Sequence, residues 1–138
     1  AEAKASVIKR DVARKSVNLK EARVIVAAGA GVGTKENFVK IQELAAALGA
    51  QIGATRAVVD AGWLPADHQI GQTGATVRPD LYIGCGVSGA VQHWVGMMDA
   101  RTIIAINSDK NAPLMKRAHY RVAGDLNVVI PKLIKLLN

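Results

Sequence analysis

Two glycine-rich segments contain the residues best suited to bind an anionic ligand. Residues 29–33 read Gly-Ala-Gly-Val-Gly and residues 86–90 read Gly-Val-Ser-Gly-Ala, and each follows an apolar stretch. Small residues leave backbone N–H groups accessible, and a helix N-terminus attracts a phosphate. The first segment lacks the full GxGxxG dinucleotide spacing and is weak by itself. The second predicts a pyrophosphate site, with a plain helix N-cap at Ser88 as the alternative.

The other reactive side chains form no recognisable catalytic or metal-binding group. Cys85 is the single cysteine, which excludes a disulfide within the chain and predicts a small buried side chain. His68 and His119 lack the spacing typical of zinc ligands. No nucleophile is paired with a base, so the sequence does not favour hydrolysis or group transfer.

Apolar β-branched runs alternate with helical patterns around these segments. Thr34 is expected to cap a helix that ends at Gly49. Many turn-forming residues fall within 60–78, which predicts a long loop, and such loops are often functional. Strands are expected at 24–28, 51–56, 81–85, 102–106 and 120–123, and further helices from Ser88 to about Met98 and from Pro131 onward.

This order of elements predicts an α/β domain with a Rossmann-like fold. Its sheet should be doubly wound and mostly parallel, with about five to six strands and helices on both faces. Ligands of such sheets bind beyond the carboxyl ends of the strands. Arg56 stands at the end of an expected strand, and Asn107 and Asp125 come after two others, as both glycine-rich segments also follow strands. We therefore expect these residues to converge on one edge and to bind a nucleotide cofactor.

Positive charge is concentrated at the beginning of the 138-residue chain, whose net charge is +7. Residues 1–23 contain seven basic and three acidic side chains. We interpret residues 1–22 as a basic lead-in segment or interdomain linker and residues 23–138 as the folded domain. No aromatic side chains interleave the basic ones, so nucleic acid is not an expected partner. No apolar run approaches the roughly 18 residues that span a bilayer, so direct membrane insertion is not expected.

Several segments, in order, resemble the signature motifs of electron transfer flavoprotein alpha subunits. They are GATRAVVDAG at 53–62, QIGQTG at 69–74, GVSGAVQH at 86–93, AIN at 105–107 and Ala112-Pro113. The resemblance extends from about Arg23 to the C-terminus and covers only the C-terminal half of the family, its FAD-binding domain. It implies that this chain is a fragment of a larger alpha subunit and that its cofactor is FAD.

The resemblance also implies roles around the flavin ring. Arg56 corresponds to an arginine over the ring, where its charge favours reduced flavin; the alternative is a surface ion pair with Asp60. Thr73 corresponds to the residue that hydrogen-bonds flavin N5. His93 corresponds to a histidine near the pyrimidine oxygen, where a donor stabilises negative charge; its alternative is a purely structural role. Thr55 keeps the hydroxyl of a serine that is common in the family, and Ile70, Gly71 and Gln72 line the same loop.

The rest of the cofactor is assigned to two further groups of residues. The pyrophosphate and ribityl chain correspond to Ser88, Gly89, Ala90, Val91 and Gln92. The adenosine half corresponds to Asn107, Asp125 and the adjacent Leu126, with helix capping as the alternative for the two polar residues. One position departs from the family pattern: Ala30 stands where an arginine is usual in the first glycine-rich loop. A phosphate or adenine contact is therefore expected to be missing, or to be replaced by a cation such as Lys35.

The function implied by the resemblance is electron carriage rather than transformation of a substrate. The expected partners are an electron transfer flavoprotein beta subunit, electron-donating dehydrogenases and an acceptor oxidoreductase. The expected compartment is the cytoplasm of a bacterium, or the mitochondrial matrix if the source is eukaryotic. From the residues alone, an NAD(P)-binding dehydrogenase domain of the same fold stays an alternative, and so does a structural or nucleic-acid-binding module that uses the basic segment.

Overall fold

The computed structural model describes residues 18–137, and these form a single five-stranded sheet. The strand order is β2-β1-β3-β4-β5, and every neighbouring pair is parallel. The predicted doubly wound α/β fold is therefore confirmed, with five strands. Four of the five expected strands of the sheet match closely, and the second ends two residues early. The strands are β1 (Val24–Ala28), β2 (Gln51–Ala54), β3 (Leu81–Cys85), β4 (Thr102–Asn107) and β5 (Tyr120–Ala123).

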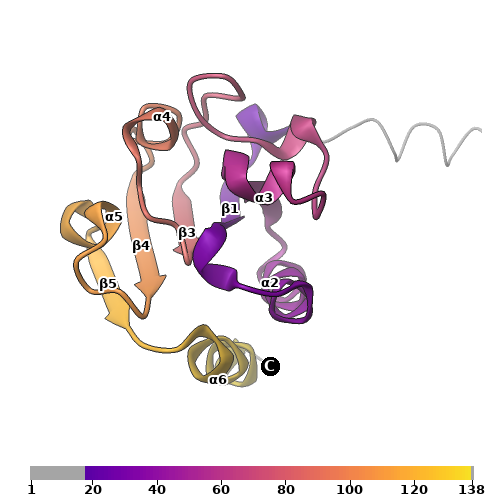
Figure 1. The fold of residues 1–138 in the computed structure, drawn as a ribbon, viewed down its shortest axis with the longest axis vertical. Helices are drawn as coiled ribbons and strands as arrows, with labels where there is room; N and C mark the ends of the chain where they lie inside the picture. Colours follow the sequence, from indigo (N-terminus) through magenta and orange to yellow (C-terminus); the bar gives the residue numbers. More distant parts are fainter. Residues whose placement is uncertain (1–17, 138) are drawn as a thin grey trace, which may run out of the picture.

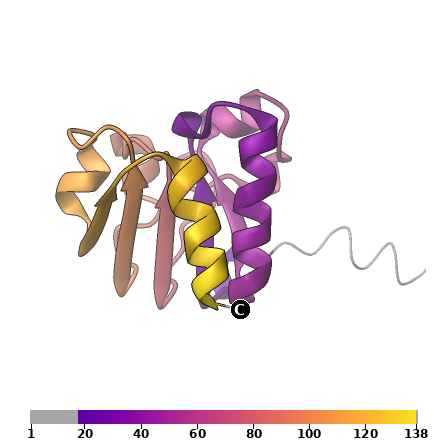
Figure 2. The same cartoon turned by 90° about the horizontal axis from the view of Figure 1, so that it is seen from below.

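Helices cover both faces of this sheet. α2 (Lys35–Leu48) and α6 (Leu126–Leu137) lie side by side on one face (Figure 2). α4 (Val91–Trp94) and α5 (Pro113–Arg117) cover the other (Figure 1). α3 (Arg56–Asp60) follows β2 after a single residue. Within the described part of the chain, no helix is long and apolar enough to cross a membrane.

Alternate side chains of the central strands enter two separate apolar cores. Along β1, Ile25 and Ala27 pack in the core beneath α4 and α5, whereas Val26 and Ala28 pack in the core beneath α2 and α6. Burial on both faces explains why the strands read as continuous apolar runs. The predicted lead-in segment also contributes a side chain to the core beneath α4 and α5, because Leu19 is buried there. Residues 1–17 of that segment lie outside the described residues.

The expected ends of α2 are confirmed. The Thr34 hydroxyl accepts a hydrogen bond from the Asn37 N–H at 3.2 Å, which satisfies a donor that the first turn leaves free. Gly49 ends the helix in the left-handed conformation, with φ of 66°.

The helix expected from Ser88 to about Met98 is wrong in extent. α4 contains only Val91–Trp94, and residues 95–99 continue as turns. Gly89 has φ of 87°, and the Ser88 carbonyl accepts from the Leu114 N–H at 2.9 Å. Residues 88–90 are thus held against α5 in a non-helical form. Ser88 is therefore not the N-cap of α4, a position that Ala90 takes.

Pro131 lies inside α6 rather than at its first position, so the expected helix start is also wrong. A proline in this place removes one backbone hydrogen bond, the one to the Asn127 carbonyl. Both residues are exposed, so water can satisfy that carbonyl. Leu126 and Ile130 are buried in the core next to α2, and their packing extends the helix in front of the proline.

Candidate functional site

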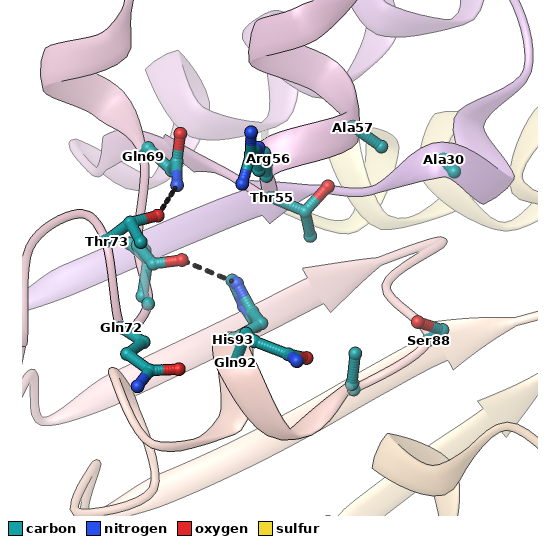
Figure 3. A pocket seen from close by; sticks show the side chains of 14 residues that line it. Ala30, Thr55, Arg56, Ala57, Gln69, Gln72, Thr73, Ser88, Gln92 and His93 are labelled. Atoms are coloured by element: carbon teal, nitrogen blue, oxygen red, sulfur yellow. Dashed lines mark hydrogen bonds between the residues drawn. The ribbon is translucent and has the colours of Figure 1, made fainter.

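A cavity of about 320 Å³ opens at the carboxyl edge of the sheet (Figure 3). Four separate segments line it: the loop after β1, the β2–α3 turn, the middle of the long 60–78 loop, and the stretch from β3 into α4. The edge predicted from the strand ends therefore does contain a hollow. Its lining residues are Ala30, Thr55, Arg56, Ala57, Gln69, Ile70, Gly71, Gln72, Thr73, Ser88, Gly89, Ala90, Gln92 and His93.

Backbone contacts between the two glycine-rich loops form one end of the cavity. The Gly31 N–H donates to the Gly86 carbonyl at 2.9 Å, and the Gly29 N–H donates to the Cys85 carbonyl at 3.0 Å. A Cβ added to Gly29 would lie 2.4 Å from the Gly86 oxygen, and one added to Gly86 would lie 2.7 Å from Gly31 carbon. These loops approach so closely only because side chains are absent. Their contact fixes the positions of Ala30 and Ser88 beside the cavity.

The long loop is attached to the segment around α4 and forms the opposite side. The Gln72 N–H donates to the Gln92 carbonyl at 2.7 Å, and the Val77 N–H donates to the Gly96 carbonyl at 2.7 Å. Gly71 has φ of 141°, and a Cβ there would lie 2.5 Å from the Gln92 oxygen. A third backbone bond, from the Ile70 N–H to the Ala54 carbonyl at 3.0 Å, joins the loop to β2, so the loop forms a wall of the cavity that backbone hydrogen bonds hold in place.

Arg56 and Thr73 present polar groups at the rim of the cavity. Arg56 forms an exposed ion pair with Asp60, with 3.5 Å between Nε and Oδ2, as the surface alternative predicted. It is the only charged residue among the described residues that line the cavity. The Thr73 hydroxyl accepts from Gln69 Nε2 at 2.8 Å, so its own O–H is available to donate to a ligand (Figure 3).

Thr55 lines the same cavity and carries an unsatisfied hydroxyl. Its Oγ1 is inaccessible to solvent and has no hydrogen-bond partner among the described residues. A buried hydroxyl without a partner costs on the order of 1–3 kcal/mol. Thr55 lines the cavity, so its unpaired hydroxyl lies close to where a ligand would bind. An unsatisfied hydroxyl is expected at such a position when the ligand supplies the missing hydrogen-bond partner.

His93 is buried against the inner side of the cavity, and both of its ring nitrogens are engaged. Nε2 lies 2.7 Å from the Tyr82 hydroxyl and Nδ1 lies 3.0 Å from the Ile70 carbonyl oxygen. Burial lowers the pKa of His93 to about 4, with the hydrogen bond to Ile70 opposing that shift. His93 is therefore neutral at physiological pH, and a direct bond to a ligand would require the ring to give up one partner.

The structure brings together eleven of the fifteen residues that the sequence analysis assigned to the cofactor. Val91 is exposed on α4 and does not line the cavity. Asn107 Oδ1 accepts from the Asp109 N–H at 3.0 Å, and Asp125 Oδ1 accepts from the Asn127 N–H at 2.8 Å. The Asp125 contact is the helix cap given as its alternative, because α6 begins at Leu126. The Asn107 contact belongs to a turn after β4 and caps no helix, because the next helix begins at Pro113 with Ala112 as its N-cap. Leu126 is buried in the core.

Three lining residues were not among the fifteen: Ala30, which the sequence placed in the first glycine-rich loop, Ala57 and Gln69. Gln69 begins the QIGQTG segment, so its position in that motif was the available signal, while Ala57 carries no distinguishing chemistry. Cys85 is buried as expected, and burial raises the pKa of its thiol to about 12. Over residues 18–137, no group of three or more His, Cys, Asp or Glu side chains is arranged to hold a metal ion.

Comparison with known proteins identifies the family. Residues 18–98 match the family model described as the electron transfer flavoprotein FAD-binding domain. An electron transfer flavoprotein subunit alpha of Thermoanaerobacterium thermosaccharolyticum is 55% identical over 123 residues, which are 89% of this chain and 37% of the relative. The corresponding subunit of Paracoccus denitrificans is 51% identical over 83% of this chain and 37% of its own length.

A protein FixB of Clostridium saccharobutylicum is also similar, at 52% identity over 86% of this chain and 35% of its own length. The chain spans a little over a third of the length of the curated relatives it matches. The family model covers more than half of the chain, and its matched range contains every residue that lines the cavity. The chain therefore belongs to the electron transfer flavoprotein alpha-subunit family and contains the FAD-binding domain of that family.

Proposed function

We propose that this domain binds FAD in the cavity at the carboxyl edge of its sheet and, within a larger electron transfer flavoprotein, carries electrons between redox partners. The observation that carries the proposal is the convergence of separate motif segments on one cavity. Family membership favours this function over the NAD(P)-binding alternative. The FAD itself supplies the redox chemistry of its isoalloxazine ring, and the protein supplies binding, orientation and electrostatics.

The residues of the cavity fit one end of such a cofactor. A volume of about 320 Å³ lies at the lower end of the usual range for small-molecule sites, so it suits the flavin half rather than the whole dinucleotide. Thr55 Oγ1 would gain the hydrogen-bond partner that it lacks among the described residues. The adenosine half would extend over Ala30 along the strand ends, toward Asn107 and Asp125.

Each group in the cavity would have a defined task. The Arg56 guanidinium would stabilise negative charge that develops on the flavin. The free O–H of Thr73 would donate to a ring nitrogen, while Gln69 keeps the hydroxyl oriented. Ser88, Gly89 and Ala90 line the cavity, and their backbone N–H groups would suit a pyrophosphate.

The larger assembly is proposed from the names of the relatives. Those relatives are called alpha subunits, and the proposed partner is a beta subunit with which the complete alpha chain forms a heterodimer. Dehydrogenases would donate the electrons, and another oxidoreductase would accept them.

The test is an aerobic FAD titration of the complete alpha subunit together with the beta subunit. Flavin absorbance should shift on binding, flavin fluorescence should change, and the bound fraction should saturate at one FAD per cavity. Failure of this complex to bind FAD, or preferential binding of NADH, would overturn the proposal.

Thr55→Val should separate cofactor binding from stability. Because it removes a buried hydroxyl that has no partner within residues 18–137, it should leave the melting temperature unchanged or raise it. The same change should weaken FAD binding by roughly tenfold, which corresponds to one lost hydrogen bond. Thr55→Ser keeps the hydroxyl and should bind as the parent does. Equal FAD affinity in Thr55→Val and the parent would show that this hydroxyl does not contact the cofactor.

Ala30→Arg should tighten FAD binding. Ala30 is exposed and lines the cavity, where Arg56 is the only charged neighbour among the described lining residues. A second cation beside a pyrophosphate should increase affinity by roughly fivefold or more at low salt, and the gain should decline as salt screens it. Ala30→Gln is the control for side-chain length. If Gln and Arg give the same affinity, charge at this position is irrelevant.

A further inference from the structure

A buried chain of hydrogen bonds joins the core of the domain to the cavity. The Tyr82 hydroxyl lies 2.7 Å from His93 Nε2, and His93 Nδ1 lies 3.0 Å from the Ile70 carbonyl oxygen. Tyr82 is on β3 and is completely buried, whereas His93 and Ile70 both line the cavity. One end of this series of hydrogen bonds therefore lies at the cavity, whereas Tyr82, at the other end, does not line the cavity.

The chemistry of the three groups determines where the protons are. A carbonyl oxygen can only accept, so Nδ1 of His93 must carry the hydrogen of that bond. A neutral imidazole then has an unprotonated Nε2, to which the Tyr82 O–H donates. Burial raises the pKa of Tyr82 well above its usual range, with Cys85 as a smaller cause, so the phenol keeps its proton.

Protonation of His93 would disrupt this arrangement. Nε2 would become a donor, and the Tyr82 proton would lose its acceptor, because His93 is the only hydrogen-bond partner of that hydroxyl among the described residues. A buried donor left without a partner is costly. The other ionisable groups nearby do not offset this cost. Cys85 is buried and neutral, and Arg56, the charged group lining the cavity, is itself a cation.

We propose that Tyr82 is a positioning residue of the site, which holds the His93 ring in place and in its neutral form by donating to Nε2. Burial lowers the pKa of His93, and the hydrogen bond donated by Tyr82 favours the neutral ring in the same direction. The consequence for the site is that positive charge next to the ligand comes from Arg56, while His93 contributes a fixed neutral ring. The part of this inference that concerns flavin rests on the proposed function, whereas the part that concerns the protonation of His93 does not.

The direct test is NMR of the complete alpha subunit with its beta subunit, labelled with ¹⁵N-histidine, both with FAD and after its removal. His93 should be the Nδ1–H tautomer and neutral at pH 7, which requires no variant. Tyr82→Phe should raise the pKa of His93 by about one unit, because the hydrogen bond that favours the neutral form is lost. Tyr120→Phe, which makes the same change at an exposed tyrosine, should leave it unchanged.

A second measurement follows the flavin. The midpoint potential of bound FAD, recorded against pH, should show the inflection caused by His93 about one unit higher in Tyr82→Phe than in the parent. An Nε2–H tautomer in the parent, or an unchanged His93 pKa in a folded Tyr82→Phe, would overturn the inference. Failure to bind any FAD would overturn the proposed function instead, and the NMR result on the FAD-free protein would still decide the role of Tyr82.

Discussion

Gly86→Ala is expected to destabilise the domain by roughly 2–5 kcal/mol and to abolish stable FAD binding. Gly86 has φ of 67°, a conformation that costs a side-chain-bearing residue roughly 1–2 kcal/mol. The new Cβ would also lie 2.7 Å from Gly31 carbon and from Val32 nitrogen, so the two glycine-rich loops would have to separate. Overpacking of this kind costs roughly 1–3 kcal/mol more.

The measurement is urea unfolding of the full chain, paired with FAD titration of the complete heterodimer. Gly49→Ala is the matched control, because Gly49 also has a left-handed conformation, with φ of 66°, but no described atom lies within 4 Å of its added Cβ. Gly49→Ala should therefore show the conformational cost alone and keep FAD. If the two variants lose equal stability, the close contact between the loops is not what makes Gly86 necessary.

Arg56→Ala is expected to lower the flavin midpoint potential by roughly 60 mV for one electron, which corresponds to about 1.4 kcal/mol of lost stabilisation of the reduced state. The potential should fall because the variant lacks a cation that would stabilise the negative charge of the reduced flavin ring. The fold should be unaffected, since the ion pair with Asp60 is exposed on both sides and contributes little. Spectroelectrochemical titration of the heterodimer checks the potential, and thermal unfolding checks the fold.

Two further variants separate charge from shape. Arg56→Lys keeps the cation and should retain most of the potential. Arg101→Ala removes a cation that is comparably exposed and pairs with Asp80 at 4.0 Å, but does not line the cavity, so it should leave the potential unchanged. A potential that is unchanged in Arg56→Ala would remove Arg56 from the vicinity of the flavin.

The framework of the domain could be predicted because it depends on signals that are local in sequence. The apolar runs mark the strands, and Thr34 and Gly49 mark both ends of α2. Residues placed after strand ends were expected to meet at one edge, and the cavity lies there. These predictions hold because continuous apolar runs separated by helices are typical of parallel strands that are buried on both faces, and few other folds fit that pattern.

The remaining features depend on contacts that are distant in sequence. Residues 88–90 resemble the start of a helix, yet the bond between Ser88 and Leu114 holds them in another conformation. Pro131 resembles a helix start, yet the packing of Leu126 and Ile130 extends α6 in front of it. The hydrogen bond from Tyr82 to His93 could not be predicted, because residues on a strand and on the next helix meet only once both have packed on the sheet.

The pairing of β1 with β3 has a consequence for the order of events during folding. Val24 pairs with Leu81 and Ala28 with Cys85, so the glycine-rich loops meet only after the intervening segment, which contains α2, β2, α3 and the long loop, has been enclosed. Parallel pairing between strands that are distant in sequence forms slowly. The entropy cost of closing the loop comes before the contacts that stabilise the pair have formed. A nascent chain that ends before β3 has no cavity wall from residues 88–93. Loading of the cofactor should therefore follow synthesis of this region, and free FAD should accelerate refolding little while stabilising the product strongly.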